Sequence, residues 1–507
     1  MRHTIRLALA SLLLLAGTAL GQQTVRIAQS LSHNTLNPAA TTGLADASVE
    51  RVIFEGLVGL DKDLKIVPEL ATSWTISPDA TVFTFELRQG VTFQDGTAFN
   101  ADAVKAYFDW ATDKNNKTSA RAQSLYANVK SIDVLGPYEV RFTLTAPDAT
   151  FLSNIALYNG RILSPASIQK YGADVGRHPV GTGPFKFVSW QEGQKITVEA
   201  NDSYWGPKPK VQRIEFIEVP NAATRVAMLQ SGEADFIESL PAQLVASVNQ
   251  SPNLEAVISK STYARIFPLN THFKPFTDVR VRQALNYAVD KEQLVKVAVQ
   301  GYGTVMDSPV PQTVRGYAAQ TPYQYDPEKA KQLLAEAGYP NGFSFTVLTF
   351  NSTEFKTAGQ VIQTMLAKVG VKVELNPTER GALVSQIFKP LSETQLEGSL
   401  VGASTPNGDA DRTLTQSFAT SSFPPAFNNW SFYSNPEVDK LIQEGRSTGD
   451  QAKRDQIYAQ AQSIIWKDAP WIFLYSPDNI AGQSKKLTGV YYMPGQTIDA
   501  RGAAFSN

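Results

Sequence analysis

No cysteine occurs anywhere in the 507 residues of this chain, which opens with the pattern of a secretory leader. Residues 1–6 (MRHTIR) supply positive charge, and residues 7–20 (LALASLLLLAGTAL) form an apolar core too short and wrongly flanked for a membrane-spanning helix. Small residues at Ala19 and Gly21 predict cleavage after Gly21, so residues 1–21 are interpreted as a signal peptide. Without cysteine, neither disulfide bonds nor the acylated cysteine of a lipoprotein can form. The mature chain is therefore expected in the periplasm or another extracytoplasmic compartment, without a lipid anchor.

Composition places the chain among folded globular proteins, because 43% of its residues are hydrophobic and 18% are charged. At roughly 100 to 200 residues per domain, the length predicts about three structural units, or two domains of which one is elaborated. The formal net charge is −1 and no long basic run is present. Since nucleic acids are bound through clustered Lys and Arg, a nucleic-acid partner is not expected.

Strand and helix patterns are mixed along the chain, which predicts an α/β or α+β fold. Alternating apolar residues in 82–93, interrupted by Gln89-Gly90, predict a β-hairpin. Asn100 is the expected N-cap of a helix with an apolar stripe. Further helices are predicted within residues 278–301, 326–342 and 451–470.

The sequence contains no convincing residue pattern of a catalytic site or of a metal site. The four histidines are scattered without metal-ligand spacing. Residues 445–449 (GRSTG) match the G-x-S-x-G pattern of serine hydrolases, but they follow a helical pattern instead of a strand, and no histidine follows Ser447. Ser447 is therefore interpreted as a residue of a loop between helices. A secreted hydrolase is the less favoured class, and no cofactor is expected.

Three polar residues are crowded into the stretch STPNGDADRT, residues 404–413: Asn407, Asp409 and Asp411. The spacing fits the start of a calcium loop, but its sixth position is Arg412 where glycine is required, and its twelfth is Phe418 where glutamate is required. Two interpretations remain open. The stretch is either a solvated turn or a site where a carboxylate binds the ammonium group of a ligand.

Several segments resemble the large solute-binding proteins of ABC importers for dipeptides, oligopeptides and nickel, known as family 5 or cluster C. The residues that carry the resemblance are 69–105 (ELATSWTISPDATVFTFELRQGVTFQDGTAFNADAVK), 178–190 (HPVGTGPFKFVSW) and 278–290 (DVRVRQALNYAVD). Within the family, residues 225–236 (RVAMLQSGEADF) and 427–439 (FNNWSFYSNPEVD) are most similar to the members that serve glutathione importers.

The resemblance implies the α/β, two-lobed periplasmic binding protein fold of type II, with an extra subdomain in lobe one and hinge closure over the ligand. Two crossings between the lobes are expected, at residues 262–270 and 471–477. The expected division is residues 22–45 (lobe one), 46–165 (extra subdomain), 166–268 (lobe one continued), 269–474 (lobe two) and 475–507 (return to lobe one).

The function implied by the resemblance is that of a monomeric extracytoplasmic receptor, not an enzyme. It captures a small peptide ligand, either a glutathione-like tripeptide or a dipeptide, and delivers it to an ABC transporter permease in the inner membrane. A nickel chelate or another small solute bound by the same fold is the alternative.

Three site residues are carried over from the dipeptide binders of the family. Asp411 matches the aspartate that holds the ligand's α-amino group, and Asp409 is a secondary candidate. Lys356 stands where those proteins carry an arginine for the peptide carboxylate. Lysine lacks the planar fork with which arginine binds a carboxylate through two hydrogen bonds, which weakens this third assignment.

Glutathione has one ammonium and two carboxylates, so its pocket needs about one acid and two cations, or backbone donors in place of cations. Arg265, on an extended segment with aromatic neighbours on its face, is either a ligand cation or the partner of a structural carboxylate. Arg412 and Arg380 are weaker candidates, more typical of surface charges. Trp430 either stacks on the ligand or fills the core, and the core interpretation is favoured.

Overall fold

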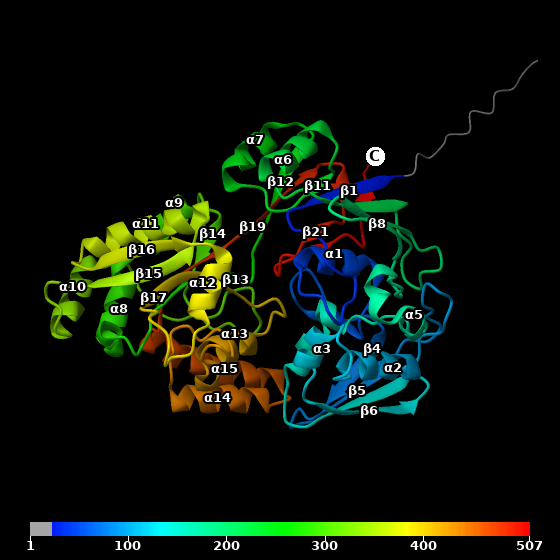
Figure 1. Cartoon of the computed structure of the whole chain (residues 1–507), viewed down its shortest axis with the longest axis horizontal. Helices are drawn as coiled ribbons and strands as arrows, with labels where there is room; N and C mark the ends of the chain where they lie inside the picture. Colours follow the sequence, from blue (N-terminus) through cyan, green and yellow to red (C-terminus); the bar gives the residue numbers. More distant parts are fainter. Residues whose placement is uncertain (1–22, 507) are drawn as a thin grey trace, which may run out of the picture.

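The computed structural model describes residues 23–506 (Figure 1), so the signal peptide expected at residues 1–21 lies outside the described residues. Three larger sheets, of seven, six and four strands, are packed with helices. This mixture confirms the predicted α/β class. The structure also contains three short two-stranded pairs, which are β2 (Val58–Leu60) with β3 (Ile66–Pro68), β20 (Leu487–Thr488) with β23 (Ala504–Phe505), and β21 (Tyr491–Tyr492) with β22 (Ile498–Asp499).

The seven-stranded sheet is built from both ends of the described chain. Strand β1 lies inside it, parallel to β10 and β11, while β19 pairs antiparallel with β11 and β12. Val25 and Ile27 of β1 are fully buried. The strands in spatial order are β12 (Leu254–Ser259), β19 (Asn479–Ser484), β11 (Phe236–Ile237), β1 (Thr24–Gln29), β10 (Arg213–Glu218), β9 (Lys195–Ala200) and β8 (Phe185–Gln191). The helices of this part are α1 (Leu44–Ile53), α5 (Pro165–Tyr171), α6 (Ala222–Ser231) and α7 (Val245–Gln250).

The four-stranded sheet forms a further unit beside the seven-stranded sheet, and together we call them lobe one (Figure 1). Asn100 caps the helix that follows, as predicted, because its side chain accepts a hydrogen bond from Ala103 N at 2.9 Å. The strands in spatial order are β4 (Ala71–Ile76), β5 (Val82–Leu87), β7 (Glu139–Leu144) and β6 (Val129–Gly136), with helices α2 (Ala101–Thr112), α3 (Ala120–Leu125) and α4 (Phe151–Ile155).

The β-hairpin predicted within residues 82–93 is wrong. Strand β5 has the alternating burial that was expected, but β4 and β7 occupy its two edges. Residues 91–93 therefore turn back on themselves, and Thr92 forms a bridge with Ala98. A local apolar alternation identifies a strand, but it does not identify the strand's partner.

The six-stranded sheet and its helices form lobe two. Strand β18 (Trp471–Pro477) shows that this sheet is covered on both faces. Successive side chains of a strand point to opposite faces, and Ile472 and Leu474 belong to one apolar core while Trp471 and Phe473 belong to another. The other strands are β14 (Gly303–Val305), β13 (Tyr263–Pro268), β17 (Gly398–Ser404), β15 (Ser344–Phe350) and β16 (Lys372–Thr378). The helices are α8 (Val279–Ala288), α9 (Lys291–Ala298), α10 (Pro327–Glu336), α11 (Thr353–Ala367), α12 (Arg380–Ile387), α13 (Ala410–Phe418), α14 (Pro436–Arg446) and α15 (Gln451–Asp468).

The chain passes between the two lobes twice, at adjacent places. Sheet membership changes between β12 and β13 and again between β18 and β19. The two connections contact each other, because Ser261 Oγ donates to the carbonyl oxygen of Pro477 and Lys260 pairs with Asp478 at 3.0 Å. The expected crossing segments 262–270 and 471–477 contain β13 and β18, which both lie in the six-stranded sheet of lobe two. The residue boundaries of the expected division remain a prediction.

Candidate ligand-binding site

The loop that contains Asp409 is held by internal charge pairs. The Asp409 side chain caps α13 by accepting a hydrogen bond from Asp411 N at 3.1 Å. The same buried carboxylate pairs with Arg315 at 2.9 Å and with Arg454 at 3.2 Å. Burial alone raises the pKa of Asp409, but the two guanidiniums outweigh it and the pKa is lowered. Asp409 is thus engaged by Arg315, Arg454 and the first turn of α13, and its role as a secondary ligand-binding residue stays a prediction.

Asp411, in the first turn of α13, has one carboxylate oxygen available. Its Oδ1 accepts a hydrogen bond from the Tyr458 hydroxyl at 2.8 Å and lies 3.9 Å from Arg446 Nε. Among residues 23–506, no hydrogen bond reaches its Oδ2. Burial raises the pKa of Asp411 to about 6, with Arg446 acting against this shift and the neighbouring Asp409 and Asp148 adding to it.

Asp411 lines a cavity of about 280 Å³, which we call the Asp411 cavity. One wall comes from lobe two, through α13, the loop before it and the end of α14, and the other from α3, α4 and their neighbours in lobe one. Its lining residues include Arg121, Asn128, Asp148, Thr150, Asn154, Asn407, Asp411, Arg412, Phe427 and Arg446.

The two walls of the Asp411 cavity are joined by hydrogen bonds. Ala149 N donates to the carbonyl oxygen of Arg446 at 2.8 Å, and Ser153 Oγ donates to Asp409 Oδ2 at 3.1 Å. Asn407 Nδ2 donates to Asn154 Oδ1 at 3.2 Å. The lobes therefore meet around this cavity, as expected of a receptor that closes over its ligand.

Two further arginines, Arg121 and Arg412, line the Asp411 cavity. Arg412 and Arg121 are half-buried, and neither forms an ion pair or a side-chain hydrogen bond within the part of the chain that the structure describes. The Nε atom of Arg412 is buried, and no group of the described residues forms a hydrogen bond with it. Arg412 was a minor candidate from the sequence. Arg121 was missed, because no local pattern in residues 119–125 indicates that α3 meets α13.

Arg265 lies at a different place, paired with a structural carboxylate. Its Nε and Nη2 donate to the two oxygens of Glu354 at 2.8 and 3.0 Å, and Tyr475 also donates to Glu354, at 3.1 Å. This is the second of the two interpretations that the sequence left open. The pair lines a separate cavity of about 580 Å³ between the lobes.

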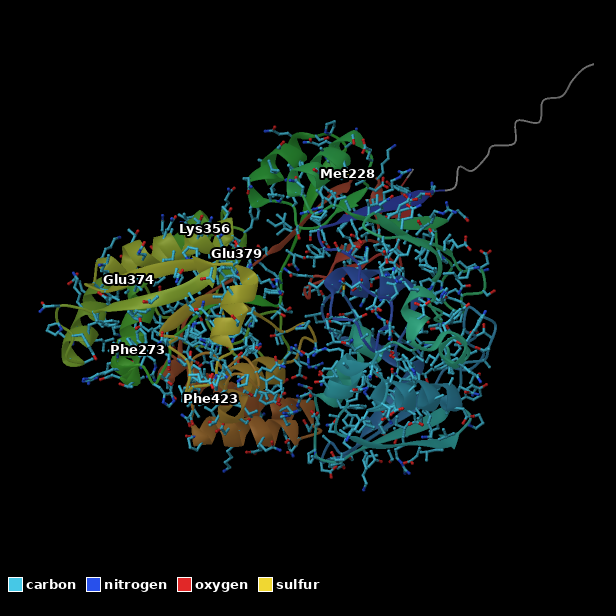
Figure 2. The ribbon with its side chains drawn as sticks, viewed as in Figure 1. Met228, Phe273, Lys356, Glu374, Glu379 and Phe423 are labelled. Carbon is cyan, nitrogen blue, oxygen red and sulfur yellow. The ribbon has the colours of Figure 1, made fainter. Side chains whose placement is uncertain are left out.

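Lys356 and Trp430 do not line the Asp411 cavity. Lys356 is half-buried on α11 (Figure 2), and no ion pair to it occurs among residues 23–506. Trp430 is only 6% exposed and packs edge-on against Phe388 at 5.9 Å between ring centroids. The structure therefore supports the core interpretation of Trp430. Arg380 is exposed at the start of α12.

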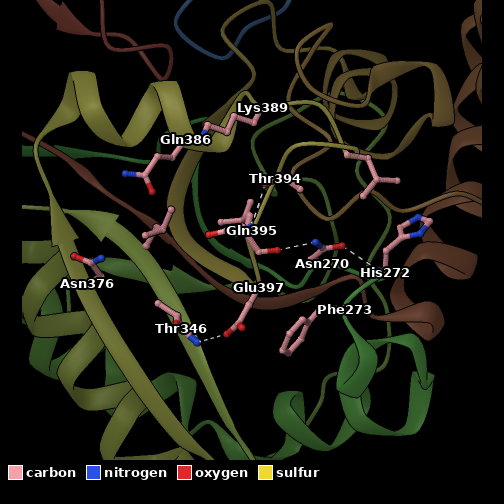
Figure 3. Close-up of a pocket in the computed structure, with 13 residues that line it drawn as sticks. Asn270, His272, Phe273, Thr346, Asn376, Gln386, Lys389, Thr394, Gln395 and Glu397 are labelled. Carbon is pink, nitrogen blue, oxygen red and sulfur yellow. Dashed lines mark hydrogen bonds between the residues drawn. The ribbon is translucent and has the colours of Figure 1, made fainter.

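A larger cavity, of about 710 Å³, lies within lobe two (Figure 3). Several of its polar groups are already engaged, since Asn270 Nδ2 donates to the carbonyl oxygen of Leu396 at 2.6 Å and Thr346 N donates to Glu397. All its lining residues lie in lobe two, so this cavity is not formed between the two lobes.

Residues 23–506 contain neither a metal-binding cluster nor a helix that could cross a membrane. No cluster of three or more His, Cys, Asp or Glu side chains there is arranged to hold a metal ion. No helix in the same part of the chain has both the length and the apolar character needed to cross a membrane. Ser447 follows the last residue of α14, and its Oγ donates to the carbonyl oxygen of Gln443 at 2.8 Å. This confirms its interpretation as a residue between two helices.

Two lobes joined by paired crossings, with a cavity walled by both, are typical of a receptor that binds a small solute. Residues 65–438 match the middle region of family 5 of the bacterial extracellular solute-binding proteins. The chain belongs to this family, whose members are substrate-binding receptors of ABC importers and not enzymes.

Relatives and solved structures are similar over nearly the whole chain. The glutathione-binding protein GsiB of Pectobacterium atrosepticum is 38% identical over 473 residues, which are 92% of this chain and 91% of that protein. The structure of HbpA2 from Haemophilus parasuis has a TM-score of 0.86 and 28% identity, covering 96% of this chain and 100% of that one. The structure of DppA from Helicobacter pylori, in complex with the peptide STSA, has a TM-score of 0.77 and 31% identity, covering 96% and 98%. These similarities confirm the expected two-lobed fold.

Because Arg265 pairs with Glu354 and does not line the Asp411 cavity, replacing it should lower stability more than it weakens ligand binding. Arg265→Met leaves the Glu354 carboxylate without its main partner, and we expect a loss of about 2 kcal/mol in the free energy of unfolding. Lys356→Met, which breaks no ion pair within residues 23–506, is the matched control, with an expected change within about 0.5 kcal/mol. Urea unfolding measures the stability of both variants. A loss of peptide affinity above about tenfold in Arg265→Met would instead place the ligand site in the cavity beside Glu354.

Proposed function

We propose that the protein captures a short peptide, glutathione or a dipeptide, in the Asp411 cavity and delivers it to the permease of an ABC importer. The relative from Pectobacterium atrosepticum is a glutathione-binding protein, and the neighbour from Helicobacter pylori was solved with a bound peptide. Asp411 supports this proposal most directly, because its Oδ2 accepts no hydrogen bond from residues 23–506 and the carboxylate lies in a cavity formed by both lobes. An ammonium group bound there gains a charge-assisted hydrogen bond away from bulk water.

The same proposal includes where the mature protein is located and that it is a monomer. A mature chain that begins at Gln22, after cleavage of residues 1–21, acts as a monomer in the periplasm and has no lipid anchor, because the sequence contains no cysteine to acylate. One ligand site enclosed by two lobes of one chain needs no second subunit.

Calorimetric titration tests the proposed ligand class. The mature protein is unfolded, stripped of carried ligand, refolded, and titrated with glutathione, a panel of dipeptides and a nickel–histidine chelate. We expect saturable, one-to-one binding of a peptide. Binding of the nickel chelate alone would assign the protein to the alternative cargo and contradict the proposal.

Peptide affinity is expected to fall as the pH drops below about 6. The raised pKa of Asp411, about 6 in the free protein, means that the carboxylate becomes protonated in that range and loses its attraction for the ammonium group. Between pH 7 and pH 5 the dissociation constant should rise about tenfold, because Asp411 goes from mostly ionised to mostly protonated over this range. The ligand's own carboxylates titrate at about 3.5, so they stay charged and do not add to the change. Calorimetry between pH 7 and pH 5 measures how the dissociation constant depends on pH, and Asp411→Asn should remove most of this dependence. The same pH dependence in that variant would exclude Asp411 as the titrating group.

A further inference from the structure

We infer that Arg121 and Arg412 together form a subsite for a second ligand carboxylate, so that the cavity selects peptides with two carboxylates and one ammonium over zwitterionic dipeptides. This inference rests on the proposed function and deepens it by naming the charge class of the ligand. It assigns the second carboxylate to one arginine from each lobe.

Neither Arg121 nor Arg412 has a counter-charge among the described residues. Arg412 lies on α13 in lobe two and Arg121 on α3 in lobe one, and both line the Asp411 cavity. No ion pair or side-chain hydrogen bond to either guanidinium occurs among residues 23–506, and Arg412 Nε is buried without a partner. Partly buried guanidiniums without counter-charges are costly to keep, which points to an anion supplied from outside the chain.

The two like charges also influence each other. Burial lowers the pKa of Arg412, and the positive charge of Arg121 lowers it further, while Tyr158 acts in the opposite direction. An anion between two neighbouring guanidiniums removes this repulsion. Each guanidinium presents several N–H donors in a plane, so a single carboxylate can accept hydrogen bonds from both.

Two other charged residues of the cavity, Asp148 and Arg446, already pair with each other. Asp148 pairs with Arg446 at 3.5 Å and accepts hydrogen bonds from Asn128 at 2.9 Å and from the Thr150 hydroxyl at 2.6 Å. Asp148 is therefore not available as an ammonium site. Asp411 retains one open oxygen, which leaves it as the ammonium site.

The charge balance then sets the ligand class. The lining includes three arginines (Arg121, Arg412 and Arg446) and two aspartates (Asp148 and Asp411), and its other residues are uncharged. With all five ionised, the cavity has a net charge of +1. A peptide with two carboxylates and one ammonium carries −1 and balances this charge, whereas a zwitterionic dipeptide leaves it unbalanced. A carboxylate held by Arg121 and Arg412 also links the two lobes.

The test compares three ligands on the mature full-length chain by calorimetry. They are glutathione, its monoethyl ester at the glycine carboxylate, and a zwitterionic dipeptide. The native protein should bind glutathione at least about tenfold more tightly than the ester or the dipeptide. This comparison needs no variant, so it does not depend on whether a substituted protein folds.

Variants then locate the preference. Arg121→Gln and Arg412→Gln should each weaken glutathione binding about tenfold or more and change ester binding less than threefold. Arg380→Gln, an exposed arginine outside the cavity, should leave both affinities unchanged. If glutathione and its ester bind the native protein equally well, or if both cavity variants retain native glutathione affinity, the second-carboxylate subsite is wrong while the peptide receptor stands. If no peptide binds the native protein, the proposed function fails as well.

Discussion

Replacing Asp409 by alanine is expected to destabilise lobe two by about 3 to 5 kcal/mol, because it breaks a buried charge network. Arg454, which is 2% exposed, would lose the carboxylate that its two Nη atoms contact at 3.2 to 3.3 Å. Arg315 would lose the same partner, and α13 would lose its N-cap. A buried guanidinium without a counter-charge is the main source of the expected loss.

Urea unfolding followed by tryptophan fluorescence measures this effect as a shift of the transition midpoint. Asp63→Ala, at an exposed aspartate of lobe one, is the matched control and should change the stability by less than about 0.5 kcal/mol. Asp409→Asn keeps a side chain able to cap α13 but removes the charge, so its effect should be intermediate. A midpoint for Asp409→Ala equal to that of the native protein would show that the arginines are satisfied by other groups.

Asp411→Asn is expected to abolish tight peptide binding without loss of stability. The substitution keeps the size of the side chain but removes the negative charge that attracts the ligand's ammonium, at an expected cost of about 2 kcal/mol or more, which is roughly thirtyfold in the dissociation constant. The folded protein should be no less stable at pH 7, because burial raises the pKa of Asp411 to about 6 and thus opposes its ionised form.

N-acetylated ligand separates this charge effect from a general distortion of the cavity. Acetylation removes the ammonium charge, so native protein and Asp411→Asn should bind the acetylated peptide with equal, weak affinity. Thermal unfolding of both proteins is the accompanying check on folding. A variant that binds the acetylated peptide much more weakly than the native protein has a disturbed cavity, and that result would contradict the assignment of Asp411 to the ammonium.

Features fixed by local residues could be predicted from the sequence, whereas features that depend on distant partners could not. The N-cap at Asn100 follows from residues within one helical turn. The partners of β5 lie in other segments, so its alternating residues gave the strand correctly but the wrong hairpin.

For the candidate site as well, the sequence indicated what local residues determine but not what depends on distant partners. Asp411 could be predicted as a site residue because it lies in a short stretch that resembles the family's dipeptide binders. Arg121 was missed because its position depends on α3 of lobe one meeting α13 of lobe two. The sequence could not decide the role of Arg265, because its partner Glu354 is on another element.

In the proposed complex, a peptide lies between the lobes with its ammonium on Asp411. A crystal structure of the protein with glutathione tests this most directly. We predict the ligand in the Asp411 cavity, with its ammonium nitrogen about 2.7 to 3.2 Å from Asp411 Oδ2 and a carboxylate on Arg412 and Arg121. Glutathione bound beside Arg265 and Glu354, or inside lobe two, with Asp411 untouched, would contradict the claim.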